Sequence, residues 1–227
     1  MVYNNRQLTT TVRNYMSKKI RRSDIENFIV EQNPYALATI NLNSNASQFG
    51  RSVQAEHSLD RVMKTLSLHL DQAFFGTRHV VDEVEAIDRF DALCFYEKLS
   101  GFPHAHCAFF LPRRDIRGGA RFLEVNRRKS FLLRHLHSRG LPIASLADQS
   151  LADIDTCPVD PRRMPILHAI DRRLKCDVRS ITNLSGVAHY VTKEIGSGQS
   201  CRLSNYRLLS EYHSHRQLRT TIGFRMP

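Results

Sequence analysis

A short apolar run with two histidines inside it constrains the fold of this chain more than any other stretch. Residues 102–111 read FPHAHCAFFL, follow Gly101 and are stopped by Pro112, which is typical of a buried strand. Strand side chains alternate between two faces, so His104 and His106 point to the same side. Two neutral imidazoles side by side on a rigid strand favour a metal site, and two core histidines with backbone or water partners are the alternative.

A second strand-like run lies just upstream and contributes a carboxylate. Residues 91–98 (DALCFYEK) are joined to the histidine run by a short turn over 99–101. A hairpin of the two runs would place Glu97 opposite the histidine end. One carboxylate and two imidazoles with open coordination positions suit Mg²⁺ or Mn²⁺ in phosphate chemistry. We therefore predict Glu97, His104 and His106 as metal ligands, although Glu97 alone is also explained as a solvated residue beside a turn.

The charge balance indicates a polyanionic partner. The 227 residues include 33 Lys and Arg against 22 Asp and Glu, which gives a formal net charge of +11. Such an excess favours nucleic acid, with an acidic membrane surface as the alternative. The length fits one domain with appendages, and an apolar content of 41% is enough for a core.

The sequence predicts no membrane or secretory segment. No apolar run approaches the roughly 20 residues that span a bilayer, and the first residues lack the apolar centre of a signal peptide. The five cysteines are odd in number and scattered, without a C-x-x-C pair. This pattern favours a reducing cytoplasm over a disulfide framework or a zinc knuckle, so we expect a cytoplasmic protein with no membrane partner.

Apolar spacing elsewhere predicts a mixture of helices and strands. Helices are expected after Ser23-Asp24 and over 52–75, 120–138 and 186–195, and further strands over 35–42 and 177–181. Residues 139–165 have little periodicity and are predicted as a long connection. The expected organisation is a basic arm and short helix over 1–33, a folded domain over 34–198 and a basic tail over 199–227.

A tyrosine and a lysine form a second candidate cluster. Tyr190 and Lys193 are three positions apart on a predicted helix and therefore share a face. A tyrosine can attack phosphorus if its proton is removed and the phosphate charge is neutralised, and a nearby lysine can hold the phosphate or stabilise the phenolate. Taken alone, the pair is more typical of a solvated helix surface.

A basic loop with two glycines follows the histidine strand. It contains Arg113, Arg114 and Arg117, and Arg121 follows shortly after. Because the loop comes directly after the strand, a bound DNA backbone can run over it, and a solvated surface loop is the alternative. We predict these four arginines as DNA-binding residues.

The order of these pieces resembles the HUH endonuclease family, and specifically the rolling-circle replication initiators (Rep proteins) with a single catalytic tyrosine. Residues 35–41 (YALATIN) resemble the family's first strand motif, 103–106 (PHAH) its His-hydrophobic-His metal motif and 190–193 (YVTK) its tyrosine motif. Glu97 stands where related initiators supply a third metal ligand across a hairpin. The resemblance spans roughly residues 34–196.

The resemblance implies a fold and a reaction. The implied fold is α+β, a central antiparallel β-sheet with flanking helices and a ferredoxin- or RRM-like core, and the domain over 34–198 would be the endonuclease. The implied reaction is nicking of single-stranded DNA at an origin or hairpin. Tyr190 would attack the phosphate and stay joined to the 5′ end, leaving a 3′-OH for a polymerase, and a second transfer would rejoin the strand. Glu97, His104 and His106 would hold Mg²⁺ or Mn²⁺, and Lys193 would assist at the phosphate or the phenolate.

Two departures refine this expectation. No second tyrosine lies near Tyr190 on its predicted helix face, which favours a mechanism with one tyrosine. The chain has no G-x-x-x-x-G-K-[ST] sequence, so unwinding is expected from a host helicase or from negative supercoiling.

Other readings stay open at this point. Within the family, a transposase or a plasmid-mobilising relaxase shares the metal motif, and relaxases commonly use a third histidine. Candidates for that histidine are His57, His69, His79, His135, His137, His168 and His189. Outside the family, the chain fits a basic DNA-binding protein without chemistry, or a metallohydrolase that activates water and never becomes joined to DNA.

Overall fold

Five antiparallel strands form the centre of the fold. The structure is a computed structural model that describes residues 22–42, 52–76, 88–98, 102–112, 115–138, 166–170, 174–195 and 206–212. The strands are β1 (Ala36–Asn41), β2 (Asp91–Glu97), β3 (His104–Phe110), β4 (Lys175–Ser180) and β5 (Tyr206–Leu208), in the order β4-β1-β3-β2-β5. The helices are α2 (Arg22–Gln32), α3 (Ser52–Phe75), α4 (Gly118–His135), α5 (Ile166–Ile170) and α6 (Leu184–Val191). The predicted α+β class is confirmed.

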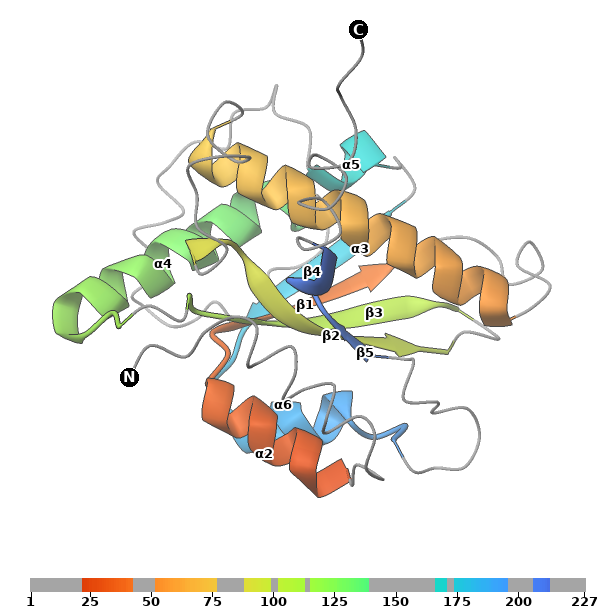
Figure 1. Cartoon of the computed structure of the whole chain (residues 1–227), viewed down its shortest axis with the longest axis horizontal. Coiled ribbons are helices and arrows are strands. Elements are labelled where there is room, and N and C mark those ends of the chain that lie inside the picture. Colours follow the sequence, from red (N-terminus) through yellow and green to blue (C-terminus); the bar gives the residue numbers. More distant parts are fainter. Residues whose placement is uncertain are drawn as a thin grey trace, which may run out of the picture.

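Helices cover the sheet on both faces. Figure 1 shows α3, α4 and α5 on one side of the sheet and α2 and α6 on the other. Because strand side chains alternate, the sheet contributes to one apolar cluster on each of its faces. The larger cluster joins residues such as Ile40, Tyr96 and Cys107 to α3 and α4. The smaller one joins Leu93 and Phe95 to α2 and α6.

The predicted hairpin is present and fixes the register at the candidate site. β2 and β3 pair so that Glu97 is opposite His104 and Phe95 is opposite His106. On the other side of β3, Thr39 of β1 is opposite His106. The two histidines therefore lie in the middle strand of the sheet, with a neighbouring strand on each side.

Helix α3 begins and ends where the sequence predicts. Apolar residues at helical spacing bury one side of it, and Leu59, Met63 and Leu66 are fully buried. Gly76, the next residue after the helix, has a φ of 95°, a left-handed conformation that favours glycine and ends the helix.

Several boundaries differ from the expectation. α6 ends at Val191 and continues as turns to residue 195, so it is shorter than predicted. α4 starts and stops slightly earlier than expected. Tyr206–Leu208, assigned to the basic tail, pairs with β2 as strand β5. Three residues are too few for a detectable alternation, and their strand conformation depends on the partner strand.

Some expectations fall on residues that the structure does not describe. The arm before α2, the connection over 139–165 and most of the tail belong to this group. Within the described residues, no helix combines the length and the apolar character needed to cross a membrane. Three of the five cysteines, Cys94, Cys107 and Cys176, are buried free thiols.

Candidate metal centre and tyrosine site

Three side chains converge at one end of the hairpin. Glu97 ends β2 and lies directly opposite His104, which begins β3. His106 is two residues further on the same face of the strand. Glu97 Oε2 lies 3.5 Å from His104 Nε2 and 3.6 Å from His106 Nε2. One ligand atom from each residue lies within 4.8 Å of the others, so this group can hold a metal ion.

Two contacts orient the imidazole rings. His104 Nδ1 lies 2.9 Å from the carbonyl oxygen of Phe102, which can only accept a hydrogen bond. A neutral His104 ring therefore has its proton on Nδ1 and its lone pair on Nε2, the atom nearer to Glu97. His106 Nδ1 lies 2.9 Å from Thr39 Oγ1, which leaves its Nε2 on the side of the same carboxylate. Hydrogen bonds at the ring nitrogen that does not coordinate the metal are a general feature of histidine ligands in metal sites.

The contact of Thr39 with His106 was not predicted, although the sequence carries a signal for it. Residues 35–42 alternate so that Thr39 and Asn41 make one side of the strand polar. The structure places these two residues opposite His106 and His104 respectively. The polar side of β1 therefore faces the same way as the two histidines.

Buried polar atoms support a cation at this group. Glu97 is 2% exposed and His106 is 1% exposed. Glu97 Oε1 and His106 Nε2 are buried and have no hydrogen-bond partner. Leaving a buried polar atom unpaired costs about 1–3 kcal/mol, so such atoms are rare. A divalent cation between the carboxylate and the two Nε2 atoms would pair them, and the three residues therefore fit a metal ion.

The electrostatics place the ligands in the protonation states that metal binding needs. Burial by itself would raise the pKa of Glu97, but contacts with His104, His106 and Lys193 outweigh it and hold the pKa well below its usual value. Burial lowers the pKa of His106, against the opposing effect of the Glu97 carboxylate. An ionised carboxylate and a neutral imidazole are the forms that coordinate metal ions.

Helix α6 positions Tyr190 over the same face of the sheet. The side-chain oxygen of Asn183 caps the helix by accepting a hydrogen bond from the N–H of Gly186 at 2.8 Å. The apolar side of α6 packs into the smaller core cluster. The ring centroids of Tyr190 and His106 are 5.0 Å apart, and Tyr190 is 46% exposed. An accessible phenol therefore lies beside the buried Glu-His-His group.

Lys193 connects the tyrosine to the carboxylate. Its Nζ lies 2.9 Å from Glu97 Oε2 and 3.9 Å from the centroid of the Tyr190 ring. Burial opposes the charge of this lysine, but the Glu97 carboxylate and then Tyr190 raise its pKa. Lys193 lies in the turns after α6, and it reaches the same group as Tyr190 even though the helix has ended.

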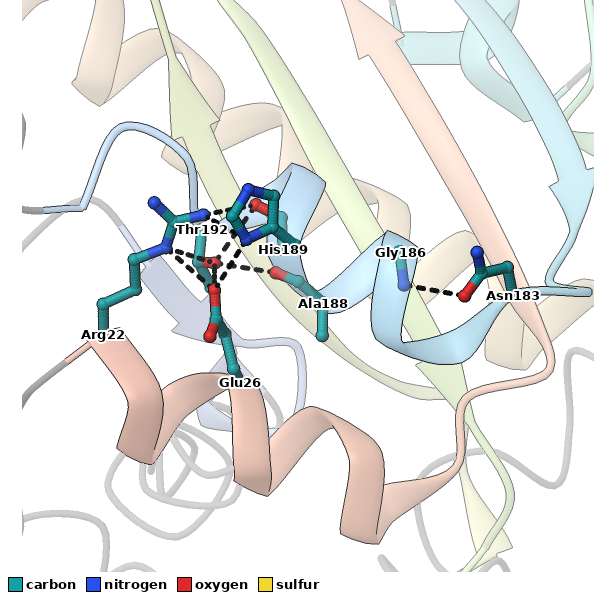
Figure 2. A network of polar contacts seen from close by, with 7 residues as sticks. All are labelled: Arg22, Glu26, Asn183, Gly186, Ala188, His189 and Thr192. Atoms are coloured by element: carbon teal, nitrogen blue, oxygen red, sulfur yellow. Dashed lines mark hydrogen bonds and ion pairs between the residues drawn. The ribbon is translucent and has the colours of Figure 1, made fainter.

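A polar network ties the end of α6 to α2, as Figure 2 shows. The fully buried Thr192 has its Oγ1 2.9 Å from Glu26 Oε1. Arg22 Nε lies 2.8 Å from the same carboxylate oxygen, and Arg22 Nη2 lies 3.0 Å from His189 Nδ1. His189 therefore contacts α2, because consecutive residues of a helix point about 100° apart and His189 is turned away from Tyr190. Nothing in the local sequence pattern identifies this network in advance.

Arg117 and Arg121, the predicted arginines that the structure describes, do not lie at the metal group. Arg113 and Arg114 are outside the described residues, and Arg117 and Arg121 are exposed at the start of α4. These positions follow the far end of β3, whereas His104 begins that strand. A strand of seven residues spans roughly 20 Å, so the metal group lies at one end of it, and Arg117 and Arg121 follow the other end.

In the part of the chain that the structure describes, no other set of three or more His, Cys, Asp or Glu side chains lies close enough together to hold a metal ion. The other histidines with described side chains, none of which joins the group, are His57, His69, His135, His137 and His189. The side chains of His79 and His168 are outside the described residues. Glu97, and no third histidine of the described part, completes the group.

Comparison with known proteins gives no family assignment. No protein family, no curated protein and no solved structure matches this chain. The functional argument therefore depends on the residues of the site and their geometry.

Proposed function

We propose that this chain is a metal-dependent enzyme that nicks and rejoins single-stranded DNA, an initiator of rolling-circle replication of the HUH type. The observation that carries the proposal is the position of the exposed Tyr190 beside the buried group of Glu97, His104 and His106. A nucleophile next to a cation site suits attack on a phosphodiester. The resemblance of the strand, histidine and tyrosine motifs supports the same assignment.

The proposed reaction is a transfer of a phosphodiester to tyrosine. The Tyr190 oxygen loses its proton and forms a bond to phosphorus, and the bond from phosphorus to the 3′ oxygen breaks. The 3′ oxygen leaves with the electron pair, takes up a proton and becomes a free 3′-OH, while the 5′ phosphate stays on the tyrosine. In the rejoining step a 3′-OH attacks the phosphotyrosine and releases Tyr190. The Lys193 ammonium lies 3.9 Å from the centroid of the Tyr190 ring, close enough to stabilise negative charge on the phenol oxygen.

The donor set supports Mn²⁺ or Mg²⁺. Two imidazole nitrogens and one carboxylate oxygen leave coordination positions for water and phosphate, and Mn²⁺ accepts both donor types. When bound, the ion would polarise the scissile phosphate and neutralise its charge. Glu97 and the two histidines would hold it, and the contacts of His104 with Phe102 and of His106 with Thr39 would keep the rings in place.

The expected partners follow from charge and motif content. A net charge of +11 supports a polyanionic substrate such as single-stranded DNA at an origin or hairpin. Because the sequence has no nucleotide-binding loop of the G-x-x-x-x-G-K-[ST] type, a host helicase would unwind the duplex and a host polymerase would extend the 3′-OH.

The deciding experiment detects the covalent intermediate. Single-stranded oligonucleotides from DNA next to the gene, labelled at the 5′ or the 3′ end, are incubated with protein and Mn²⁺ and separated on denaturing gels. We expect only the 3′-label to move with the protein, because the 5′ phosphate of that fragment is joined to tyrosine. EDTA should prevent this product.

Two tyrosine variants make the result specific. Tyr190→Phe should abolish the adduct and leave DNA binding within a few-fold, because only a hydroxyl is lost. Tyr206→Phe is the matched control, since its buried hydroxyl has no hydrogen-bond partner, and it should keep the adduct. Cleavage without an adduct would favour a water-activating hydrolase, and salt-sensitive binding without cleavage would favour a DNA-binding protein.

A further inference from the structure

We propose that, in the metal-free protein, the Lys193 ammonium takes the place of the metal ion as the cation paired with the Glu97 carboxylate. A divalent ion that binds at the site displaces this ammonium. Lys193, which is already adjacent to Tyr190, would then give up its ion pair with Glu97 and be free to serve the phenol oxygen or a bound phosphate when the metal is present. This inference rests on the metal site of the proposed function and adds a coupling between that site and the lysine.

The lysine and the histidines converge on a single carboxylate oxygen. Lys193 Nζ lies 2.9 Å from Glu97 Oε2, and the Nε2 atoms of His104 and His106 lie 3.5 and 3.6 Å from the same oxygen. A metal ion held by Glu97 and the two histidines would bind the same carboxylate that Lys193 contacts. An ammonium group that keeps its present position would then be in the immediate neighbourhood of a divalent ion. Two cations at such a distance repel strongly, so the lysine and the metal compete for the carboxylate.

The lysine is the partner that can move. Glu97 is held by β2 and is 2% exposed, whereas the Lys193 side chain is 36% exposed and follows the end of α6. A lysine has a flexible stem of four carbons, so it can leave the carboxylate without a change in the sheet. A second partner is already adjacent, because Nζ lies 3.9 Å from the centroid of the Tyr190 ring.

The pairing of Lys193 with Glu97 matters in both the metal-free and the metal-bound state. A buried carboxylate without a cation is costly, and Lys193 prevents that cost while no metal is bound. Once the metal takes over, the released ammonium can neutralise charge at the phenolate or at the phosphate. The positive charge of Lys193 would then be shared with Glu97 while no metal is bound, and would be available in full to the reacting atoms once the metal is present.

The test measures Mn²⁺ affinity by calorimetry on metal-free protein, without any DNA. Lys193→Met removes the competing cation and keeps the length of the stem, and we expect Mn²⁺ to bind about tenfold more tightly than in the unchanged protein. Lys98→Met is the matched control. It removes one positive charge from an exposed residue adjacent in sequence to Glu97, and its Mn²⁺ affinity should stay within about twofold.

A second readout follows the same coupling through thermal unfolding. In EDTA, Lys193→Met should unfold at a lower temperature than the unchanged protein, because Glu97 loses its cation. Saturating Mn²⁺ should raise the unfolding temperature more in the variant than in the unchanged protein, since a ligand that binds more tightly stabilises more. Lys193→Gln, which has a polar end, gives the same comparison if the methionine variant does not fold.

The outcomes separate this inference from the proposed function. Equal or weaker Mn²⁺ binding in Lys193→Met would overturn the inference and leave the metal site intact. Equal tightening in Lys98→Met would overturn it in favour of an effect of overall charge. If the unchanged protein and every variant fail to bind Mn²⁺, the metal site of the proposed function fails with it.

Discussion

At the scale of single residues, the two histidines of the candidate metal centre are held by partners of different kinds. The partner of His104 is the backbone carbonyl of Phe102, which no side-chain substitution removes. The partner of His106 is the hydroxyl of Thr39, at 2.9 Å. If a metal binds at Nε2 of His106, the Nδ1 atom of His106 must carry the ring proton. Thr39 Oγ1 can then accept a hydrogen bond from this N–H group. The orientation of His106 can therefore be changed by one isosteric substitution.

We predict that Thr39→Val weakens Mn²⁺ binding by about tenfold, because loss of a partner behind a metal ligand typically has an effect of this size. Calorimetric titration of the metal-free protein measures it. Thr182→Val, at an exposed position outside the strands, should bind Mn²⁺ like the unchanged protein. Unchanged affinity in Thr39→Val would mean that the hydroxyl does not hold the ring.

At the scale of secondary-structure elements, the position of the tyrosine depends on a helix of only eight residues, α6. A helix this short has little stability of its own, so packing and polar contacts must hold it. The buried Thr192, just beyond its last turn, has its hydroxyl within 2.7 Å of the carbonyl oxygen of Ala188 and 2.9 Å of Glu26 Oε1. With one proton, the hydroxyl donates to one of these acceptors at a time.

We expect Thr192→Val to lower the free energy of unfolding by about 1–2 kcal/mol, because the part-buried hydrogen bond from Thr192 to Glu26, which joins the end of α6 to α2, is lost. Urea denaturation measures this change. Thr65→Val is the control, since the Thr65 hydroxyl makes only the equivalent contact with a carbonyl of its own helix, that of Arg61 at 2.9 Å. Equal losses in the two variants would show that the contact between helices adds nothing.

A buried carboxyl group on α3 predicts a pH dependence of stability. Asp71 is 1% exposed and accepts a hydrogen bond from the N–H of Phe90 at 3.0 Å. Burial raises its pKa from 3.8 to about 7. Between these values the folded protein keeps a proton that the unfolded chain releases. The contribution of Asp71 to stability is therefore complete below the lower value and is lost as the pH rises towards 7.

Asp71→Asn should remove this dependence. We expect the stability of the variant relative to the unchanged protein to rise with pH by at most about 1.4 kcal/mol per pH unit over this interval. Urea denaturation of both proteins at a series of pH values measures the difference. A constant difference over the series would contradict the prediction.

Those elements whose pattern is long or clearly bounded were predictable. α3 has a long apolar periodicity and a terminal glycine, and the hairpin has two apolar runs around a short turn. The end of α6 was missed because the apolar spacing continues to Ile195, which packs against the smaller core cluster without being helical. The contacts of Thr39 and of Glu26 depend on which distant segments become neighbours, and local spacing does not contain that information.

At the scale of the whole molecule, the candidate centre lies apart from Arg117 and Arg121, the two predicted arginines that the structure describes. The metal group is at the start of β3, on the face that α2 and α6 cover (Figure 1). Arg117 and Arg121 follow the other end of that strand, at the start of α4, which belongs to the opposite face. Because the arginines follow the histidine strand in the sequence, we expected one continuous DNA path over both. The length of β3 instead separates the metal group from these arginines. A strand of DNA would contact both regions only if it extends well beyond the nick.

This separation predicts that Arg117→Ala combined with Arg121→Ala affects long and short DNA differently. With a long single-stranded oligonucleotide we expect weaker binding, and a slope of log affinity against log salt that is smaller by about 1.4, because two phosphate contacts are lost. With a short oligonucleotide centred on the nick, affinity and nicking rate should not change.

Arg61→Ala with Lys64→Ala removes the same charge from exposed positions on α3 and serves as the control. Fluorescence anisotropy over a salt series measures all of these affinities. An equal loss for both lengths of DNA would place the arginines at the nick, and an equal change of slope in the control would assign the effect to net charge.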